Sequence, residues 1–440
     1  MRIAIIGAGV AGVCSAYELA AAGHQVTVFE RRGSVAAEGS FATGGHIAPA
    51  LALPWLAPSF PRPGAGPLGW QWQRWRSQRK PAMQEAQDRV LHLARFSHER
   101  LQQLRRHLQL DHERAEGQLV LLRQDKDQKA IQFGLERLQR LDMPYRLLDA
   151  AQCLAVEPGL NPEIALHGGI QLGLGEVGNT RQFCHLLRSE AQRLGARFRF
   201  HTTVRRLEAG APASLVHEYT PTDEQLGPST PQLRRAEPPD AGDTQPAPLG
   251  PQEERFDAVL VCAGTGAAPL LKALGLKPRW RELHTQSITA PLRVLEAHPH
   301  LGPVAGLLDW QRQVGISRIG QRVRIASLPS PIALELKASS LAPLHQALSD
   351  WFPGAMQGGQ VQNWQGRHLA LDDGLPLLGA SGQTGIWLNL AQQSLAHSGW
   401  TLACGAAAVL ARQIGGGTAA QGAQDPTLPD IGGLDIGRWA

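Results

Sequence analysis

The chain opens with an alternation of apolar and glycine-rich stretches. Residues 3–6 are aliphatic, residues 13–22 are mostly small or aliphatic, and residues 26–29 are apolar at three positions before the carboxylate of Glu30. A short apolar run bounded by glycine is typical of a buried strand, whereas a longer run of this kind favours a helix. The opening pattern therefore predicts a strand, a glycine turn, a helix and a second strand.

The rest of the chain alternates helical and strand patterns. Residues 82–110 and 181–194 place apolar residues at helical spacing between charges, so both are expected to be amphipathic helices, and helices are also expected at 126–141, 338–352 and 400–414. Strands are expected at 117–123, within 165–178 and at 197–207. The run 256–262 is apolar and predicts a parallel strand buried on both faces. Residues 283–290, 305–309, 312–318 and 321–327 predict an antiparallel sheet.

The glycines after the first predicted strand have the spacing of a dinucleotide-binding turn. Gly7 permits the tight turn, Gly9 lets a pyrophosphate approach the backbone, and Gly12 lets the helix pack closely on the sheet. The phosphates would then meet the positive N-terminus of the helix. Glu30 closes the second strand, where a carboxylate accepts hydrogen bonds from the adenosine ribose. The combination predicts a bound dinucleotide.

The residues around Glu30 bear on which dinucleotide is bound. An acidic residue here disfavours the 2′-phosphate of NADP, although Arg31 and Arg32 leave the opposite interpretation open. Residues 39–49 form a loop of small residues, including Ser40, which lets the backbone approach a second part of an extended cofactor. This loop favours FAD, and a plain surface loop is the alternative.

Composition and charge narrow the classes of protein. The 440 residues are 43% hydrophobic and 18% charged, as expected for a globular chain of about two domains. The net charge of +5 comes from scattered basic residues, so a nucleic-acid partner is not expected. The five cysteines lie far apart, so neither a metal site nor a disulfide framework is expected. No apolar run approaches the ~20 residues that cross a bilayer, and the protein is expected to be cytoplasmic.

Two segments stand apart from these patterns. Residues 53–81 are rich in proline, tryptophan and basic residues, and either lie peripherally on the inner membrane face or pack as core aromatics under a basic rim. Residues 209–254 are rich in proline and polar residues and almost lack aromatic ones. Such a composition buries too little apolar surface to offset ordering, so it predicts a disordered or loosely packed insertion between two strands, without a catalytic role.

Taken together, the motifs resemble those of the small-subunit-type D-amino acid dehydrogenases, within the wider family of FAD-dependent glycine, sarcosine and D-amino acid oxidases. The resemblance covers nearly the whole chain apart from 209–254. The segments that carry it are 7–30, 40–49 with Pro54 and Trp55, 176–179 with Gln182 and Phe183, 261–264, 374–379, 387–389 and 399–405.

The resemblance implies an α/β fold, with a Rossmann-like FAD-binding domain interleaved with an α+β substrate domain built on an antiparallel sheet. The FAD-binding domain is expected from residues 1–80, 165–208, 255–275 and 365–425, and the substrate domain from 81–164 and 276–364. Residues 426–440 are expected to form a C-terminal tail. FAD, bound without a covalent link, would contact Gly7, Gly9, Gly12, Glu30, Ser40, Val204, Gly264 and Gly399.

The resemblance also implies an enzyme that deaminates a D-amino acid by hydride transfer to the flavin and passes the electrons to a quinone-type acceptor. Such chemistry needs a cation for the substrate carboxylate, correct orientation and a positive field near the flavin pyrimidine. The helix after Gly399 would supply that field from its N-terminus. Two alternatives remain: an oxidase acting on glycine, sarcosine or a similar amine, and a catalytically degenerate FAD-binding protein.

The chain departs from the family pattern where the substrate would bind. The expected arginine of the segment 366–374 is His368, with Arg367 one position early, and a one-residue displacement on a strand turns a side chain to the opposite face. His368 would bind a carboxylate only when protonated, which predicts an acidic bias of the activity. The flavin loop 389–400 is longer than in the family and lacks its glycines.

Four residues are therefore the candidates for the substrate site. Arg318 matches a family arginine and is the best remaining cation, with a strand-end arginine in solvent as the alternative. Gln286 lies near the place of a missing family tyrosine. The four candidate residues are Arg318, His368, Arg367 and Gln286.

Overall fold

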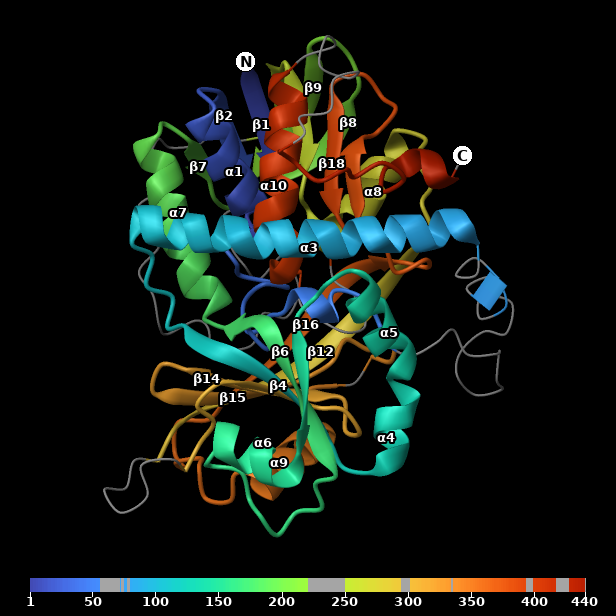
Figure 1. The fold of residues 1–440 in the computed structure, drawn as a ribbon. Coiled ribbons are helices and arrows are strands. Elements are labelled where there is room, and N and C mark those ends of the chain that lie inside the picture. The colour runs from blue at the N-terminus through green and yellow to red at the C-terminus, as the bar shows by residue number, and fades with distance from the viewer. Residues whose placement is uncertain are drawn as a thin grey trace.

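The computed structural model describes residues 1–55, 72, 75, 76, 80–220, 250–293, 301–333, 335–392, 399–416 and 427–439. Two sheets occupy opposite halves of the molecule, and both chain termini lie in the half that holds the parallel sheet (Figure 1). The long helix α3 (Pro81–Leu108) crosses the molecule between the two halves. The predicted α/β fold with a parallel and an antiparallel sheet is confirmed.

The first sheet is built on the opening strand of the chain. Aliphatic residues of this strand are fully buried, because it pairs in parallel with a neighbour on each side. Only β17 runs antiparallel to its neighbour in this sheet. In spatial order the strands are β17 (Leu377–Ala380), β18 (Ile386–Leu390), β11 (Ala258–Val261), β1 (Arg2–Ile6), β2 (Gln25–Phe29) and β7 (Arg197–Arg199).

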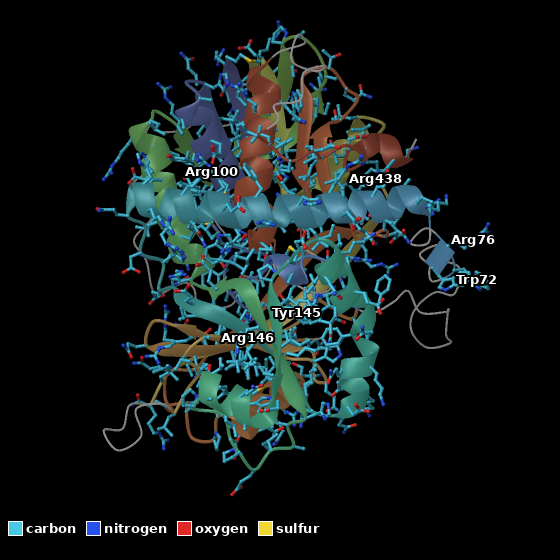
Figure 2. The ribbon with its side chains drawn as sticks, in the orientation of Figure 1. Trp72, Arg76, Arg100, Tyr145, Arg146 and Arg438 are labelled. Carbon is cyan, nitrogen blue, oxygen red and sulfur yellow. The ribbon has the colours of Figure 1, made fainter. Side chains whose placement is uncertain are left out.

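Helices from distant parts of the chain cover this sheet. They are α1 (Val10–Ala21), α7 (Thr180–Arg193), α8 (Ala267–Ala273) and α10 (Trp400–Gly415). Helix α3 joins them, since its apolar residues share one core with α1 and α10. Arg100 of α3 also pairs with Glu18 of α1 at 2.8 Å (Figure 2). The assignment of α3 to the substrate domain is therefore wrong, because its amphipathic pattern predicts a buried face but does not identify what covers that face.

The second sheet has nine strands and is mostly antiparallel, with one parallel pair between β13 and β4. In spatial order its strands are β16 (Gln362–Leu371), β12 (Trp280–Pro291), β15 (Arg322–Ser327), β14 (Val314–Ile319), β13 (Gly306–Asp309), β4 (Ala115–Leu122), β6 (Gly168–Val177) and β3 (His46–Ile47), while β5 (Tyr145–Asp149) pairs with β6. Helices α4 (Asp125–Ala130), α5 (Gln132–Arg140), α6 (Ala150–Val156) and α9 (Ala338–Trp351) pack around it.

The predicted domain boundaries differ from the sheets at three strands. Strands β3 and β6, and β16 from residue 365 onward, were expected in the FAD-binding domain, but β3 pairs with β6. Strand β6 pairs with β4, and β16 pairs with β12 along ten positions. Strand β16 leads into β17 of the parallel sheet and β6 leads into helix α7, and a local sequence pattern does not mark which partner a strand takes.

The expected insertion 209–254 is partly ordered, because its two ends belong to a small third sheet. This sheet is formed by β8 (Thr202–Glu208), β9 (Ala213–Tyr219) and β10 (Gln252–Phe256) in antiparallel order. Both ends of the segment are thus ordered, because alternate residues such as Ala213 and Leu215 are buried against the parallel sheet. Residues 221–249 lie outside the described part of the chain, as do most of residues 56–79 in the tryptophan-rich segment.

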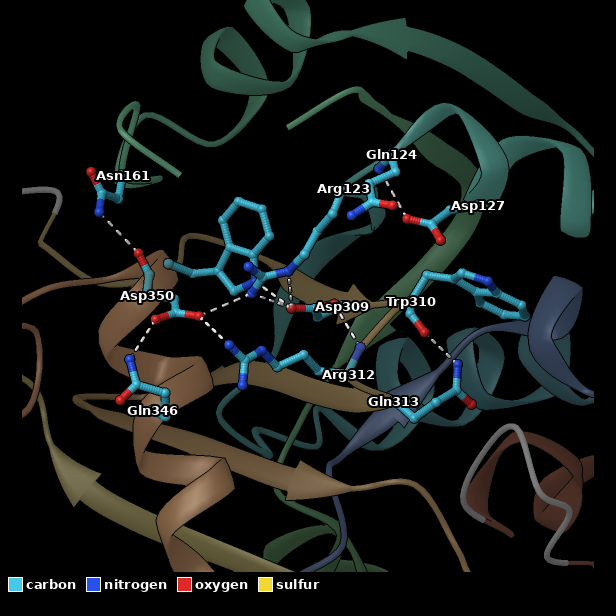
Figure 3. Close-up of polar contacts among 11 residues, drawn as sticks. Arg123, Gln124, Asp127, Asn161, Asp309, Trp310, Arg312, Gln313, Gln346 and Asp350 are labelled. Carbon is cyan, nitrogen blue, oxygen red and sulfur yellow. Dashed lines mark hydrogen bonds and ion pairs between the residues drawn. The ribbon is translucent and has the colours of Figure 1, made fainter. Parts of the chain in front are cut away.

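A charged cluster ties the second sheet to α9 (Figure 3). Arg123 donates to Asp309 at 2.8 Å and reaches Asp350 at 3.3 Å, while Arg312 pairs with Asp350 at 2.9 Å. The indole of Trp351 donates to the same Asp309 oxygen at 2.7 Å. Since Asp309 is completely buried, its charge depends on these donors.

The C-terminal segment docks on the parallel-sheet half. Arg438, labelled in the half that holds the parallel sheet in Figure 2, donates to Asp373 at 2.8 Å and to the Pro376 carbonyl at 2.8 Å. A short 3-10 helix, Ile436–Trp439, closes the described chain. Among the described residues, no helix combines the length and apolar character needed to cross a membrane.

Candidate functional site: a dinucleotide cavity that meets the antiparallel sheet

The turn between β1 and α1 has the geometry that its glycines predict. Gly7 has a φ of +98°, and a Cβ atom there would lie 2.7 Å from the Cys262 carbonyl oxygen. A Cβ atom at Gly12 would lie 1.9 Å from the Gly7 carbonyl oxygen, so α1 packs directly on the turn. At Gly9 the nearest atom would be the Ser40 hydroxyl, 3.3 Å away. Gly7 and Gly12 are therefore required by the fold, whereas Gly9 leaves space for a ligand.

The carboxylate of Glu30 is held at the end of β2. It accepts hydrogen bonds from the backbone amides of Ala8 at 2.7 Å and Arg32 at 2.8 Å. Burial raises the pKa of Glu30 to about 7, with Glu38 adding to the effect, although the two amides act in the opposite direction. The side chain is therefore fixed where two ribose hydroxyls would reach it.

This raised pKa makes a prediction for the protein without FAD. A carboxyl whose pKa rises from 4.5 to about 7 on folding destabilises the fold once it ionises, so stability is lost as pH rises through that window. Relative to Glu30→Gln, the wild-type protein is expected to lose up to about 3 kcal/mol between pH 4.5 and 7. Urea unfolding of the two apoproteins at several pH values measures this difference. Parallel pH profiles would contradict it.

The two arginines after Glu30 are occupied by a neighbouring carboxylate. Arg31 pairs with Glu38 at 2.5 Å, and Arg32 pairs with the same carboxylate at 2.7 Å. Burial acts to raise the pKa of Glu38, but the two arginines hold it below its ordinary value. Because Arg31 and Arg32 are both paired with Glu38 and Glu30 is acidic, these residues do not offer a free site for the 2′-phosphate of NADP.

A cavity of about 390 Å³ runs along these elements. All the predicted FAD-binding residues line it except Gly12, which packs beneath the turn. The lining members of that prediction are Gly7, Gly9, Glu30, Ser40, Val204, Gly264 and Gly399. Three features of the cavity fit FAD. They are the glycine backbone, whose open space a side chain would fill, the carboxylate of Glu30 at the ribose position, and the N-terminus of α1.

Two features of the cavity wall were not specified by the glycine motif. The Ser40 hydroxyl accepts a hydrogen bond from the Val10 amide at 3.1 Å and so satisfies one of the free amides at the start of α1. Helix α10 begins at Trp400 against the same cavity, which places its positive end on the wall as expected. Residues 393–398 of the predicted flavin loop 389–400 lie outside the described residues.

The loop 42–44 lies between the cavity and the antiparallel sheet, and hydrogen bonds to its backbone carbonyls hold it in place. Ser287 donates to the Ala42 carbonyl at 2.8 Å. Arg324 donates to the Thr43 carbonyl at 3.0 Å, and Ser317 donates to the Gly44 carbonyl at 2.8 Å. Burial lowers the pKa of Arg324 to about 10. These contacts from three strands fix the loop, and no local sequence pattern predicts them.

Two of the four substrate candidates reach the cavity. Arg367 lines it, although 58% of its side chain is exposed and its nearest acid is Glu282 at 4.0 Å. His368 is buried, and its Nε2 lies 2.9 Å from the Thr285 hydroxyl. Burial lowers the pKa of His368 to about 4, with His284 adding to the effect. At neutral pH His368 is therefore expected to be uncharged, because burial disfavours the protonated imidazole.

The side chains of the other two candidates point away from the loop 42–44. Gln286 donates to the Ser340 hydroxyl at 3.1 Å, at the start of α9. Arg318 donates to the Gly320 carbonyl at 3.1 Å. Neither lines the cavity. The structure thus brings together Arg367 and His368, and it leaves Arg318 and Gln286 outside.

The cysteines provide no alternative chemistry in the described residues. All five are free and buried. Burial raises the pKa of Cys262, which lines the cavity, to about 12, so its thiol stays protonated. No group of acidic, histidine or cysteine side chains in the described ranges is arranged to hold a metal ion.

Known proteins are similar to this chain over nearly its whole length. A family model described as FAD dependent oxidoreductase (DAO) matches residues 2–413. The chain is 33% identical to a D-amino acid dehydrogenase of Rhizorhabdus wittichii, covering 94% of this chain and 96% of the relative. It is 31% identical to a D-amino acid dehydrogenase of Cereibacter sphaeroides, covering 99% and 94%.

Solved structures share the fold. Glycine oxidase from Geobacillus kaustophilus superposes with a TM-score of 0.69 at 17% identity, covering 99% of this chain and 98% of that one. L-Proline dehydrogenase from P. horikoshii superposes with a TM-score of 0.68 at 14% identity, covering 100% and 97%. At such identities the likeness establishes the fold alone.

Proposed function

Because the chain belongs to the DAO family of FAD-dependent oxidoreductases, we propose that it oxidises a D-amino acid to the imino acid, which water hydrolyses to a keto acid and ammonia. The two electrons pass to a quinone-type acceptor. Bound FAD supplies the acceptor for the substrate's α-hydride. The D-amino acid dehydrogenases among its relatives support this substrate class.

One observation carries the proposal. The FAD cavity meets a second, smaller cavity on the face of the antiparallel sheet, and Thr43 and His368 line both. A substrate in the smaller cavity would lie directly beside the group in the larger one. Such a junction between a dinucleotide cradle and an enclosed chamber orients a small molecule toward the cofactor and excludes bulk water.

The residues at this junction have separate tasks. The three hydrogen bonds to the carbonyls of residues 42–44 keep the Thr43 backbone in place. Binding of the substrate therefore does not have to order this loop. His368 stays neutral and is oriented by Thr285, so it provides shape and a hydrogen bond instead of charge. Arg367 is the candidate cation at the cavity, and we assign the substrate carboxylate to it.

Anaerobic addition of single D-amino acids to the holoenzyme tests the proposal. At least one D-amino acid is expected to bleach the flavin absorbance. The bleached enzyme is expected to reoxidise rapidly with a soluble quinone and slowly with air. Rapid reoxidation by air would favour an oxidase of the glycine or sarcosine type, and no bleaching by any amino acid would leave a binding protein without turnover.

Two arginine variants separate the candidate cations in the same assay. Arg367→Gln is expected to raise the substrate concentration for half-maximal reduction about tenfold, by removing one charge-assisted contact. Arg318→Gln is expected to change it little, since Arg318 does not line the cavity. The reverse ranking would overturn the assignment of the carboxylate to Arg367.

A further inference from the structure

The smaller cavity, here called the side-chain chamber, has walls that set limits on its occupant. It lies between the loop 42–44 and the sheet, and leucine and proline side chains form much of its surface, including Leu51, Leu308, Leu328 and Pro329. Its volume is about 40 Å³. A water-sized group needs ~10–15 Å³ of such space, so the chamber holds about three of them.

The chamber carries no charged lining residue within the described part of the chain. The titratable residues that line it are His46 and His368, and burial lowers the pKa of both imidazoles. The buried cation on the same sheet face, Arg324, does not line the chamber, because its guanidinium is turned to Thr289 and the Thr43 carbonyl. An ionised side chain placed here would lose its hydration without gaining a partner.

One end of the chamber is polar. Nδ1 of His46 lies 2.8 Å from Oε1 of Gln118, and both side chains line the chamber. Gln118 is only 1% exposed, and its Nε2 has no hydrogen-bond partner among the described residues. Whichever way the amide is turned, one of its two polar atoms is left for another molecule. A buried amide atom without a partner is costly unless a ligand satisfies it.

Glycines make room for this pair. A Cβ atom at Gly306 would lie 2.7 Å from Oε1 of Gln118, and a Cβ atom at Gly315 would lie 2.4 Å from Nε2 of His46. Any other residue at these two positions would displace the polar end of the chamber. The sheet is therefore shaped around His46 and Gln118, which a core needing only apolar filling would not require.

From these observations we propose that the side-chain chamber receives the substrate's side chain and selects a short, uncharged one with a hydroxyl tip, with Gln118 as the specificity-determining residue. This inference rests on the proposed function for the location of the α-carbon. The inference adds the chemical class of the substrate's side chain, which the junction of the two cavities does not define.

Matched substrates test the selection by kcat/KM for flavin reduction. D-Serine and D-2-aminobutyrate differ only in a hydroxyl or methyl tip, and D-serine is expected to be favoured about tenfold. D-Asparagine and D-aspartate have the same shape but differ in charge, and D-asparagine is expected to be favoured at least ~30-fold. Equal values within each pair would overturn the inference while leaving the proposed deamination intact.

Binding of analogues that lack the α-amine gives a readout independent of turnover. Calorimetry on the holoenzyme is expected to rank 3-hydroxypropanoate over butanoate, and succinamate over succinate. If these rankings hold but no amino acid reduces the flavin, the chamber is correct and the proposed function fails. If reduction occurs but the rankings are absent, the chamber assignment fails.

Two variants of the chamber locate the selection. Gln118→Leu is expected to abolish the preference for a hydroxyl tip in both assays and to retain FAD. Ala326→Val, in the chamber wall, is expected to weaken butanoate and 3-hydroxypropanoate binding together about tenfold, since it removes space and not polarity. Gln132→Leu changes an exposed glutamine of α5 and serves as the control. An unchanged hydroxyl preference in Gln118→Leu would exclude Gln118 as the determinant.

Discussion

Replacing Gly9 with leucine is expected to give a folded protein that no longer retains FAD. The backbone at Gly9 is extended, with φ −68° and ψ −179°, so a side chain can be built there without strain. Its first atom would meet only the Ser40 hydroxyl at 3.3 Å, and the rest would enter the cavity where the pyrophosphate approaches α1. The expected loss of FAD affinity is at least ~1000-fold, or about 4 kcal/mol.

Flavin content of the purified variant and calorimetric titration with FAD measure this loss. Two other glycines provide the comparison. Gly12→Ala is expected to give no folded protein, because its Cβ atom would lie 1.9 Å from a backbone oxygen. Gly358→Leu, at a position with no atom within 4 Å, is expected to bind FAD normally. Wild-type affinity in Gly9→Leu would show that the pyrophosphate does not lie on α1.

Replacing Asp309 with alanine is expected to cost about 3–5 kcal/mol of folding free energy. Asp309 is completely buried and accepts from Arg123, the Trp351 indole and the Arg312 amide, as Figure 3 shows in part. The substitution leaves those donors buried without their acceptor, and Asp350 alone must then compensate Arg123. The loss should appear as destabilisation of the antiparallel-sheet half.

Urea unfolding of the FAD-saturated variants measures this cost. Asp125→Ala is the matched control, because Asp125 is a solvent-exposed partner of Lys129 on α4 and its removal is expected to leave the unfolding midpoint unchanged. An unfolding midpoint of Asp309→Ala equal to that of this control would mean that the cluster contributes nothing to stability.

The FAD-binding unit could be predicted from the sequence because its signals are local. Gly7 needs a left-handed backbone, Gly12 has no room for a side chain, and Glu30 ends its strand 18 positions later. Each constraint acts within about thirty residues, so a single sequence displays it. The partners of α3, β6 and β16 could not be predicted in this way, since they lie far away along the chain.

The substrate face shows where the sequence pattern was insufficient. Thr285 and Ser287 point toward the loop and His368, so Gln286 between them must point away. Ser317 likewise bonds the loop, and Arg318 beside it faces the other side. Because side chains alternate between the two faces of a strand, one known contact assigns the face of every other residue. The sequence alone does not say which face the loop 42–44 covers. The same alternation places Arg367 and His368 on opposite faces of β16, yet both line the larger cavity, because β16 is the edge strand of its sheet.

Anaerobic reduction of the bound flavin by the two enantiomers of alanine tests the central claim most directly. Alanine has the smallest chiral side chain, so the result does not depend on the preference of the side-chain chamber. D-Alanine is expected to bleach the flavin at least ~100-fold faster than L-alanine, because only one hand presents its α-hydrogen to the junction at Thr43 and His368. Equal rates, or no bleaching by either enantiomer, would contradict the assignment of D-amino acid oxidation to this site.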